Sequence, residues 1–261
     1  MASIDTERWL ALCANHRPIH WGERVLAGSF AALVLAGLYG AVAGSMVDYL
    51  PVMRRLPTWI DEVVPFTAFA VLPYAWIFPQ AIAPLAFISD RRVLVRVALG
   101  YLLMFAVGIP FWVLLGVTVP RAPLAGDDFW TWGVGVVRWF DPPTNCFPSM
   151  HVAEAFLSAL LVRRLDQKMG SLLLGLAFLV WWSTLAIDQH WFLDGVAGVF
   201  LAVAVNHFVF AIRPLPQEAL RSDGGRTRLG WIAAVFGVGI LAAAAVWGSG
   251  RWPVAQFEGR W

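Results

Sequence analysis

Apolar stretches of about 20 residues recur along this chain of 261 residues, and they constrain its fold more than any other feature. Such a stretch is long enough to cross the roughly 30 Å hydrocarbon layer of a membrane as an α-helix. Backbone groups inside lipid must be hydrogen-bonded within the protein, and the alternating pattern of a membrane β-barrel is absent. The composition agrees, because 59% of the residues are hydrophobic and only 14% are charged, against about 25% charged in soluble domains. We therefore expect an all-α integral membrane protein.

The predicted architecture is a helical bundle of six to seven transmembrane spans. The span 63–88 contains four prolines, each of which removes a backbone donor, so we expect it to be kinked or broken into two pieces. The candidate spans are 25–47, 63–88, 93–119, 148–162, 171–187, 191–212 and 229–247.

The segments between the spans are short. Apolar residues at near-helical spacing in 48–62 predict an amphipathic helix in the headgroup layer. Asp127 and Asp128 are typical of the first turn of a helix rather than of a metal site. Without a repeat or a long linker, we expect a single domain over residues 1–261.

The basic residues indicate an orientation. With the N-terminus in the cytoplasm, thirteen of the nineteen lie inside and six outside, which agrees with the positive-inside rule. In a bacterial inner membrane this places the segments around 145–151 and 188–194 on the periplasmic face. The arginines of the loops act as topological signals, and no basic stripe suggests a nucleic-acid partner. The outside residues are Arg54, Arg55, Arg121, Arg138, Arg251 and Arg260.

The segment 145–151 reads Asn-Cys-Phe-Pro-Ser-Met-His and carries the first group of chemically active side chains. Pro148 suits the first turn of a helix, and Asn145 is a plausible capping residue upstream. The free amides of Ser149, Met150 and His151 would then face outward and, with the helix dipole, form an anion site. His151 lies in the same turn and suits acid–base work.

The segment 188–194 reads Asp-Gln-His-Trp-Phe-Leu-Asp and carries the second group. His190 and Asp194 are four residues apart at the start of a span, so on a helix they share one face. The carboxylate can then orient the imidazole and stabilise its charged form. A structural His–Asp pair at a membrane boundary would have the same spacing.

Together the segments 146–152 and 183–194 resemble two signature motifs of the type-2 phosphatidic acid phosphatase superfamily. That family writes them as Ser-x-His after a Pro or Ser, and as Ser-Arg-x5-His-x3-Asp. The resemblance is strongest over 145–198, within an expected family-like core at about 63–212 that is followed by an extra span at 229–247. The same motifs are also similar to a branch of the superfamily that includes inositol phosphorylceramide synthases and sphingomyelin synthases.

The resemblance implies a role for each matching residue. His190 would attack phosphorus to form a phosphohistidine, Asp194 would orient it, and His151 would protonate the departing oxygen. Ser149 would hold a phosphate oxygen. No metal or other cofactor is implied.

Two positively charged positions of the family are missing. Thr184 stands where the family has the Arg of its last motif, and the family's Lys-x6-Arg-Pro motif is not found. Because phosphoryl transfer needs positive charge on the phosphate oxygens, we expect Arg121 or Arg138 to supply it. Arg138 could instead pair with Asp141.

Three further polar side chains enter the predicted substrate site. Thr184 occupies the position of the missing Arg. Glu154, one helical turn after His151, can orient that histidine or pair with an arginine. Gln189 can contact the headgroup, although a solvated loop position would explain it too.

The predicted activity is hydrolysis of a phosphomonoester or diphosphate of a membrane lipid, such as phosphatidate, phosphatidylglycerophosphate or a polyprenyl diphosphate. One alternative is a phosphotransferase that moves a phospho-headgroup to a lipid alcohol. A second is a lipid-binding or transport protein that has lost catalysis.

Overall fold

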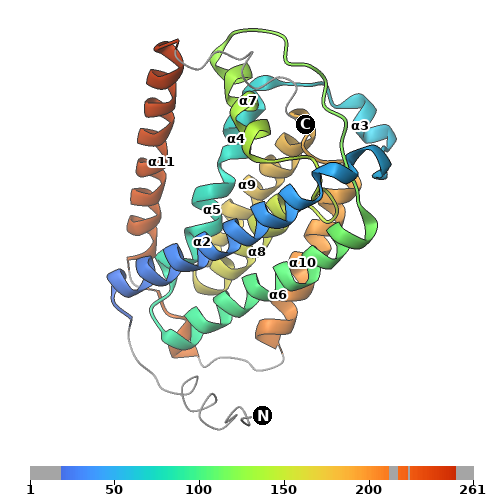
Figure 1. Cartoon of the computed structure of the whole chain (residues 1–261). Helices are drawn as coiled ribbons and strands as arrows, with labels where there is room; N and C mark the ends of the chain where they lie inside the picture. Colours follow the sequence, from blue (N-terminus) through green and yellow to red (C-terminus); the bar gives the residue numbers. More distant parts are fainter. Residues whose placement is uncertain (1–18, 212–216, 223, 251–261) are drawn as a thin grey trace.

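A computed structural model of the chain describes residues 19–211, 217–222 and 224–250, and among these it contains helices and no strand. Figure 1 shows them as one bundle, with α2 and α6 side by side and oblique to the other long helices. The helices are α2 (Trp21–Ser45), η1 (Val47–Val52), α3 (Trp59–Val63), η2 (Ala68–Ala70), α4 (Val71–Ala75), α5 (Ile77–Phe87), α6 (Arg91–Leu115), α7 (Phe129–Phe140), α8 (Met150–Leu165), α9 (Gln167–Ala186), α10 (Phe192–Ala211), η3 (Gln217–Leu220) and α11 (Gly225–Gly248).

Five helical segments of the described chain are long and apolar enough to cross a membrane, which confirms an all-α integral membrane protein. The other two predicted spans correspond to α2 and α8 and remain predictions. α8, with 16 residues, is shorter than the roughly 20 that usually span. The five segments are Ala68–Phe87, Arg91–Leu115, Gln167–Ala186, Phe192–Phe210 and Gly225–Gly248.

The proline-rich span is broken, as predicted. It consists of η2, α4 and α5, and the break between the two α-helices falls at Trp76. Inside the bundle, the Gln80 side chain of α5 donates hydrogen bonds to the carbonyl oxygens of Ala155 (2.9 Å) and Leu173 (3.0 Å). These bonds tie the broken span to α8 and α9, where lipid could not satisfy the polar groups.

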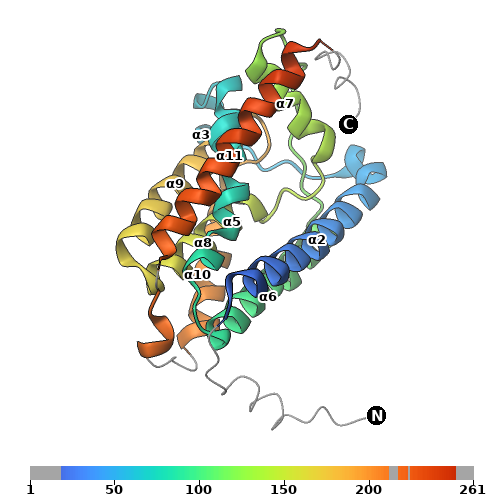
Figure 2. The ribbon, with the colours of Figure 1, turned by 90° about the vertical axis from the view of Figure 1, so that its left-hand side faces the viewer.

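The centre of the bundle is α8, which packs against α9, α10 and α5. Small side chains such as Ala153, Ala155 and Ala159 are fully buried along it, so its neighbours approach closely. α11 lies at the periphery, where it stands apart in Figure 1 and faces the viewer in Figure 2. Most of its surface is left for lipid contact, and its place outside a family-like core remains a prediction.

Short helices cover the end of the bundle nearest the predicted motifs. The segment 48–62 contains η1 and α3, and the capping box of α3 joins Thr58 to Asp61. Asp128 caps α7 by accepting from the amides of Trp130 and Thr131, which confirms the predicted first turn. These elements hold the loops around the candidate site, since Asp61 also accepts a 2.7 Å hydrogen bond from the amide of Phe192.

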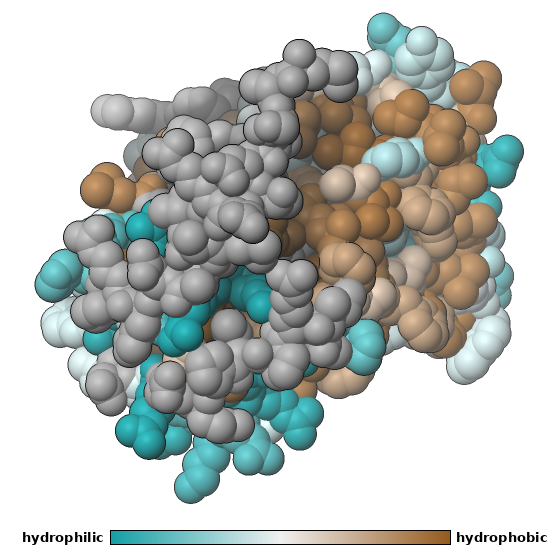
Figure 3. All heavy atoms as spheres, turned by 90° about the horizontal axis from the view of Figure 1, so that it is seen from below, coloured by the Kyte–Doolittle hydropathy of each residue, from teal (hydrophilic) through white to brown (hydrophobic). Residues whose placement is uncertain are grey.

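The two motifs lie at the same end of the bundle because α8 and α9 form an antiparallel hairpin. Arg163, Arg164 and Lys168 lie at the opposite end, around its tight turn at Asp166. Figure 3 views the molecule from that end and shows hydrophilic residues gathered beside a broad hydrophobic surface. The direction relative to the membrane remains a prediction. Five of the arginines used for it lie outside the described residues, namely Arg8, Arg17, Arg213, Arg251 and Arg260.

The first turns of α8 and α10 touch through their backbones at Gly198. The amide of Ser149 donates a 3.0 Å hydrogen bond to the carbonyl oxygen of Asp194. A Cβ added to Gly198 would lie 2.6 Å from the carbonyl oxygen of Ser149, closer than real contacts allow. The absence of a side chain at Gly198 therefore lets the two motifs meet.

We predict that Gly198→Ala destabilises the protein by roughly 1–3 kcal/mol, because the added methyl overpacks two backbones that cannot separate freely. The control is Gly175→Ala on α9, where an added Cβ meets nothing within 4 Å. Alanine favours a helix over glycine by about 1 kcal/mol, so the control should be as stable as the wild type or slightly more so. Thermal unfolding midpoints in detergent measure both, and equal midpoints would contradict the close contact.

Candidate active site

The two motif histidines lie in direct contact. His151 is in the first turn of α8, and His190 lies in the short segment between α9 and α10. The Nδ1 atom of His151 is 3.2 Å from the Nε2 atom of His190, although 39 residues separate them in the chain. The structure therefore brings the two predicted halves of the site together.

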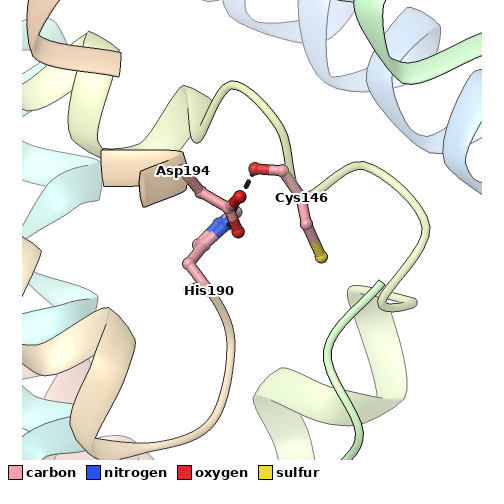
Figure 4. Close-up of side chains that lie close together, drawn as sticks. All are labelled: Cys146, His190 and Asp194. Atoms are coloured by element: carbon pink, nitrogen blue, oxygen red, sulfur yellow. Dashed lines mark hydrogen bonds and ion pairs between the residues drawn. The ribbon is translucent and has the colours of Figure 1, made fainter. Parts of the chain in front are cut away.

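The environment of His190 determines which ring nitrogen carries its proton. Its Nδ1 atom lies 3.1 Å from the carbonyl oxygen of Cys146 and 3.6 Å from Oδ2 of Asp194, and both are acceptors (Figure 4). A carbonyl oxygen cannot donate, so Nδ1 carries the hydrogen and Nε2 keeps a lone pair in the neutral ring. The nitrogen that faces His151 is therefore the nucleophilic one.

The expectation that His190 and Asp194 share a helical face was wrong in detail. α10 begins at Phe192, so His190 precedes the helix and only Asp194 lies in its first turn. The carboxylate Oδ2 also accepts a 2.8 Å hydrogen bond from the amide of Trp191, which fixes it at the helix start. The carboxylate is thus held in place by the backbone, next to the imidazole.

The predicted cap of α8 was also wrong. Ser149, and not Asn145, is the capping residue, and its hydroxyl accepts a 3.4 Å hydrogen bond from the amide of Val152. The amide of Ser149 is used by the carbonyl of Asp194 and is not free for an anion. Because a hydroxyl both accepts and donates, the Ser149 side chain still has its hydrogen to offer a ligand.

Arg121 and Gln189 form a hydrogen-bonded pair beside the histidines. Nη2 of Arg121 donates a 2.6 Å hydrogen bond to Oε1 of Gln189, whose side chain is buried rather than solvated. Burial lowers the pKa of Arg121, whereas the negative charge of Asp141 opposes that shift.

Several donors in this region lack a hydrogen-bond partner within the described part of the protein. They are Nε and Nη1 of Arg121, Nε2 of Gln189 and Nδ2 of Asn145. A buried N–H without a partner costs about 1–3 kcal/mol, so an anion that accepted these hydrogen bonds would be bound strongly.

Arg138 forms its hydrogen bonds with other groups of the protein. Its guanidinium donates to the carbonyl oxygens of Ala122 (2.6 Å) and Ile187 (3.4 Å) and lies 3.3 Å from the carboxylate of Asp188. Burial, followed by the charge of Arg121, lowers the pKa of Arg138 to about 10. The alternative pairing with Asp141 is replaced by the pair with Asp188, and Arg138 connects the two loops that carry the site.

Thr184 and Glu154 are not placed as predicted. The hydroxyl of Thr184 donates to the carbonyl oxygen of Trp181 at 2.7 Å, and its own carbonyl accepts from the amides of Gln189 and His190. Thr184 therefore shapes the turn that presents His190. Glu154 forms no hydrogen bond to His151 in the described structure, but it is close enough to Tyr74 to interact electrostatically.

Sequence reasoning assigned no role in the site to four polar residues of this region. Tyr39, Tyr74 and Asp141 form hydrogen bonds next to His151, and Asn145 is buried with its unpaired amide. Only Asn145 adjoins a motif, and it was assigned a different role. The tyrosines lie in apolar spans, where spacing in the sequence offers no sign of a catalytic neighbour.

Ligand atoms of Cys146, His190 and Asp194 lie within 4.8 Å of one another, so these residue types could hold a metal ion. Figure 4 shows their side chains close together. Two of the donor atoms already have protein partners, since Nδ1 of His190 binds a carbonyl and Oδ2 of Asp194 accepts from an amide. Burial also raises the pKa of the Cys146 thiol well above its usual value, which disfavours the thiolate that binds metals.

Two histidines in contact, each near a carboxylate and with an arginine that has unpaired donors close by, suit an enzyme that transfers a phosphoryl group. Residues 94–218 match the family model of the PAP2 superfamily, and the matched region runs from α6 into η3. The match supports the type-2 phosphatase superfamily, whose members are phosphatases or phosphotransferases, and thus an enzyme of that class. Neither the curated proteins nor the solved structures contain a significant match to this chain.

Proposed function

We propose that the protein is a lipid phosphate phosphatase that acts through a phosphohistidine on Nε2 of His190. The observation that carries the proposal is the pair of acceptors around Nδ1 of His190, which leaves the Nε2 lone pair facing His151. The resemblance to the type-2 phosphatase superfamily implies phosphoryl transfer through a histidine. His190 and the adjacent His151 supply the nucleophile and the acid for that reaction.

In the first step, Nε2 of His190 attacks phosphorus and the bond from phosphorus to the leaving oxygen breaks. Protonated His151 delivers its Nδ1 proton to that oxygen, which departs as an alcohol. The ring of His190 becomes positively charged, and the carboxylate of Asp194 stabilises that charge. No part of this step requires a metal ion.

The phosphate must separate the two histidines, because they are in hydrogen-bond contact in the resting site. The nucleophile and the proton donor lie at opposite ends of an in-line displacement, so a bound phosphoryl group occupies the space between them. The direct contact between the two histidines therefore belongs to the free enzyme. When substrate binds, each histidine contacts the phosphoryl group or its leaving oxygen instead of the other histidine.

Arg121 is the proposed replacement for the family's missing positive charge. Its unpartnered Nε and Nη1 atoms can donate to two phosphate oxygens, as guanidinium groups do to phosphates. Gln189 holds the guanidinium in place, and Asn145 and the Ser149 hydroxyl add further donors. Preorganised donors of this kind stabilise the charge that develops in the transition state.

In the second step, neutral His151 accepts a proton from water through Nδ1, and the resulting nucleophile attacks the phosphohistidine. Inorganic phosphate leaves, and both histidines return to their starting states. A lipid alcohol in place of water would make the same site a phosphotransferase. The candidate substrates are phosphomonoesters or diphosphates of membrane lipids, because the site lies at one end of a bundle whose outer surface is apolar.

Localisation is part of the proposal. The excess of basic residues at one end supports a bacterial inner membrane protein with a cytoplasmic N-terminus. The site would then face the periplasm.

We predict that His190→Ala lowers phosphate release from phosphatidate by roughly 10³-fold or more, because the nucleophile is removed. The matched control is His207→Ala, an exposed histidine in α10, which should keep the wild-type rate. Rapid acid-free quenching with ³²P-labelled substrate should trap an acid-labile phosphohistidine in the wild type and not in His190→Ala. Full activity of His190→Ala on lipid phosphates that the wild type cleaves would refute the mechanism.

We predict that Arg121→Ala lowers kcat/KM by roughly 10²–10³-fold, because the main positive charge on the phosphate is lost. Arg55→Ala, in an exposed outer segment, should change kcat/KM little. Inhibition by orthovanadate, a phosphate analogue, should weaken in Arg121→Ala in parallel with activity. Loss of activity with unchanged vanadate inhibition would indicate that Arg121 does not contact the phosphate.

We predict that the labelled phosphoryl group appears in inorganic phosphate when enzyme and labelled phosphatidate are incubated in mixed micelles containing diacylglycerol or ceramide. This outcome requires that water compete successfully with the lipid alcohols for the phosphohistidine. Thin-layer chromatography separates the products, with His190→Ala as the blank. Label that moves mainly into a second lipid would identify a phosphotransferase instead.

A further inference from the structure

Asp141 belongs to neither motif but lies next to His151. It follows the last residue of α7, and its Oδ2 atom is 3.8 Å from Nε2 of His151. This mirrors His190, whose Nδ1 atom is 3.6 Å from Asp194. Each histidine of the site therefore has a carboxylate on the side that faces away from the other histidine.

Two tyrosines fix Asp141 in that position. The hydroxyl of Tyr39 in α2 donates a 2.8 Å hydrogen bond to Oδ1 of Asp141. The hydroxyl of Tyr74 in α4 lies 3.3 Å from Oδ2 and 2.8 Å from Nε2 of His151. Tyr74 thus bridges the carboxylate and the imidazole, and the other carboxylate oxygen has its own donor.

We propose that Asp141, through Tyr74, positions His151 and keeps the proton on its Nε2 atom, so that Nδ1 is the nitrogen that exchanges protons. This inference rests on the proposed phosphohistidine mechanism and adds a positioning pair to it. The Tyr74 oxygen accepts from Nε2–H, and the Tyr74 hydrogen turns to Oδ2 of Asp141. Nδ1 is left facing His190 and the reacting phosphate.

His151 loses and regains one proton in each catalytic cycle, always on Nδ1. In the acid form, His151 carries a proton on each nitrogen, and the negative charge of Asp141 stabilises the imidazolium. After Nδ1 gives its proton to the leaving oxygen, Nε2 still donates to Tyr74. Nδ1 then accepts a proton from water, so the Tyr74–Asp141 side never releases one.

The charged and titratable groups around His151 favour this assignment. Burial disfavours the protonated form of His151, and the nearby His190 and Arg121 add to that effect, whereas Asp141 is the carboxylate in contact with the ring and favours the protonated form. Without Asp141, burial and the neighbouring cation would disfavour the acid form further. The groups that face His151 are Tyr39 from α2, Tyr74 from α4, Arg121 from the loop before α7, Asp141 from the end of α7 and His190 from before α10.

The test compares Asp141→Asn with wild type on two substrates of different leaving group. An alkyl phosphate needs a proton on its leaving oxygen, whereas 4-nitrophenyl phosphate departs readily without one. In single-turnover measurements of alcohol release, Asp141→Asn should be slower by about 10²-fold on the alkyl phosphate. The loss on 4-nitrophenyl phosphate should be less than about 5-fold, since general-acid catalysis contributes little there.

Matched variants separate positioning from folding. Asp127→Asn removes an exposed carboxylate that precedes α7 and should leave both rates unchanged. Asp141→Glu should recover part of the alkyl phosphate rate, because the charge is kept. Tyr74→Phe should show the same selective loss as Asp141→Asn, so the proposal stays testable if one variant fails to fold, as judged by its thermal midpoint.

Equal losses on both substrates, or no loss on either, would overturn the role of Asp141 while the phosphatase mechanism stands. A wild-type enzyme that forms no phosphohistidine with any lipid phosphate would overturn the proposed function and this inference together. The two failures are distinguishable, because the first requires an active wild type.

Discussion

The hydrogen bond from the amide of Ser149 to the carbonyl oxygen of Asp194 joins the starts of α8 and α10, and the site depends on it. It is formed because Gly198 allows the backbones to meet. The bond places His151 and His190 in contact and holds Asp194 behind the second of them. A separation of even one side chain between these helices would leave two polar motifs at unrelated positions of a membrane protein.

Because the site is largely buried, its polar groups need hydrogen-bond partners from the protein or from a ligand. Polar groups that cannot reach water must be satisfied by the protein or by a ligand, and an unsatisfied one costs more the deeper it lies. The nitrogens of His190 and His151 that face away from the contact have protein partners, which leaves the facing nitrogens for reaction. Donors of Arg121, Gln189 and Asn145 lack an acceptor among the described residues, and in the proposed mechanism a phosphate group is that acceptor.

The proposed mechanism requires that the positive charge of the site come from a different position than in the family motif. Where the family has an arginine, Thr184 turns its hydroxyl to the helix backbone, and its carbonyl supports the turn before His190. In the proposed mechanism the positive charge comes from Arg121, on a different loop. Arg138, the other sequence candidate, is engaged by Ala122, Ile187 and Asp188, so it connects the loops around the site.

The sequence by itself determined the features that depend on neighbouring residues. Long apolar runs specify membrane helices, prolines break one of them, and Asp128 begins another, because these effects act within a few residues. The spacing from His190 to Asp194 likewise keeps their side chains close whichever residue starts the helix. Only the tertiary structure decided the cap at Ser149, the pairing of Arg121 with Gln189, and the contacts of Tyr39 and Tyr74 with Asp141 and His151. Tyr39 is 102 residues from Asp141 and Tyr74 is 77 residues from His151, and no periodicity encodes contacts over such separations. They arise when whole helices pack, since the buried polar groups must then find partners across the bundle.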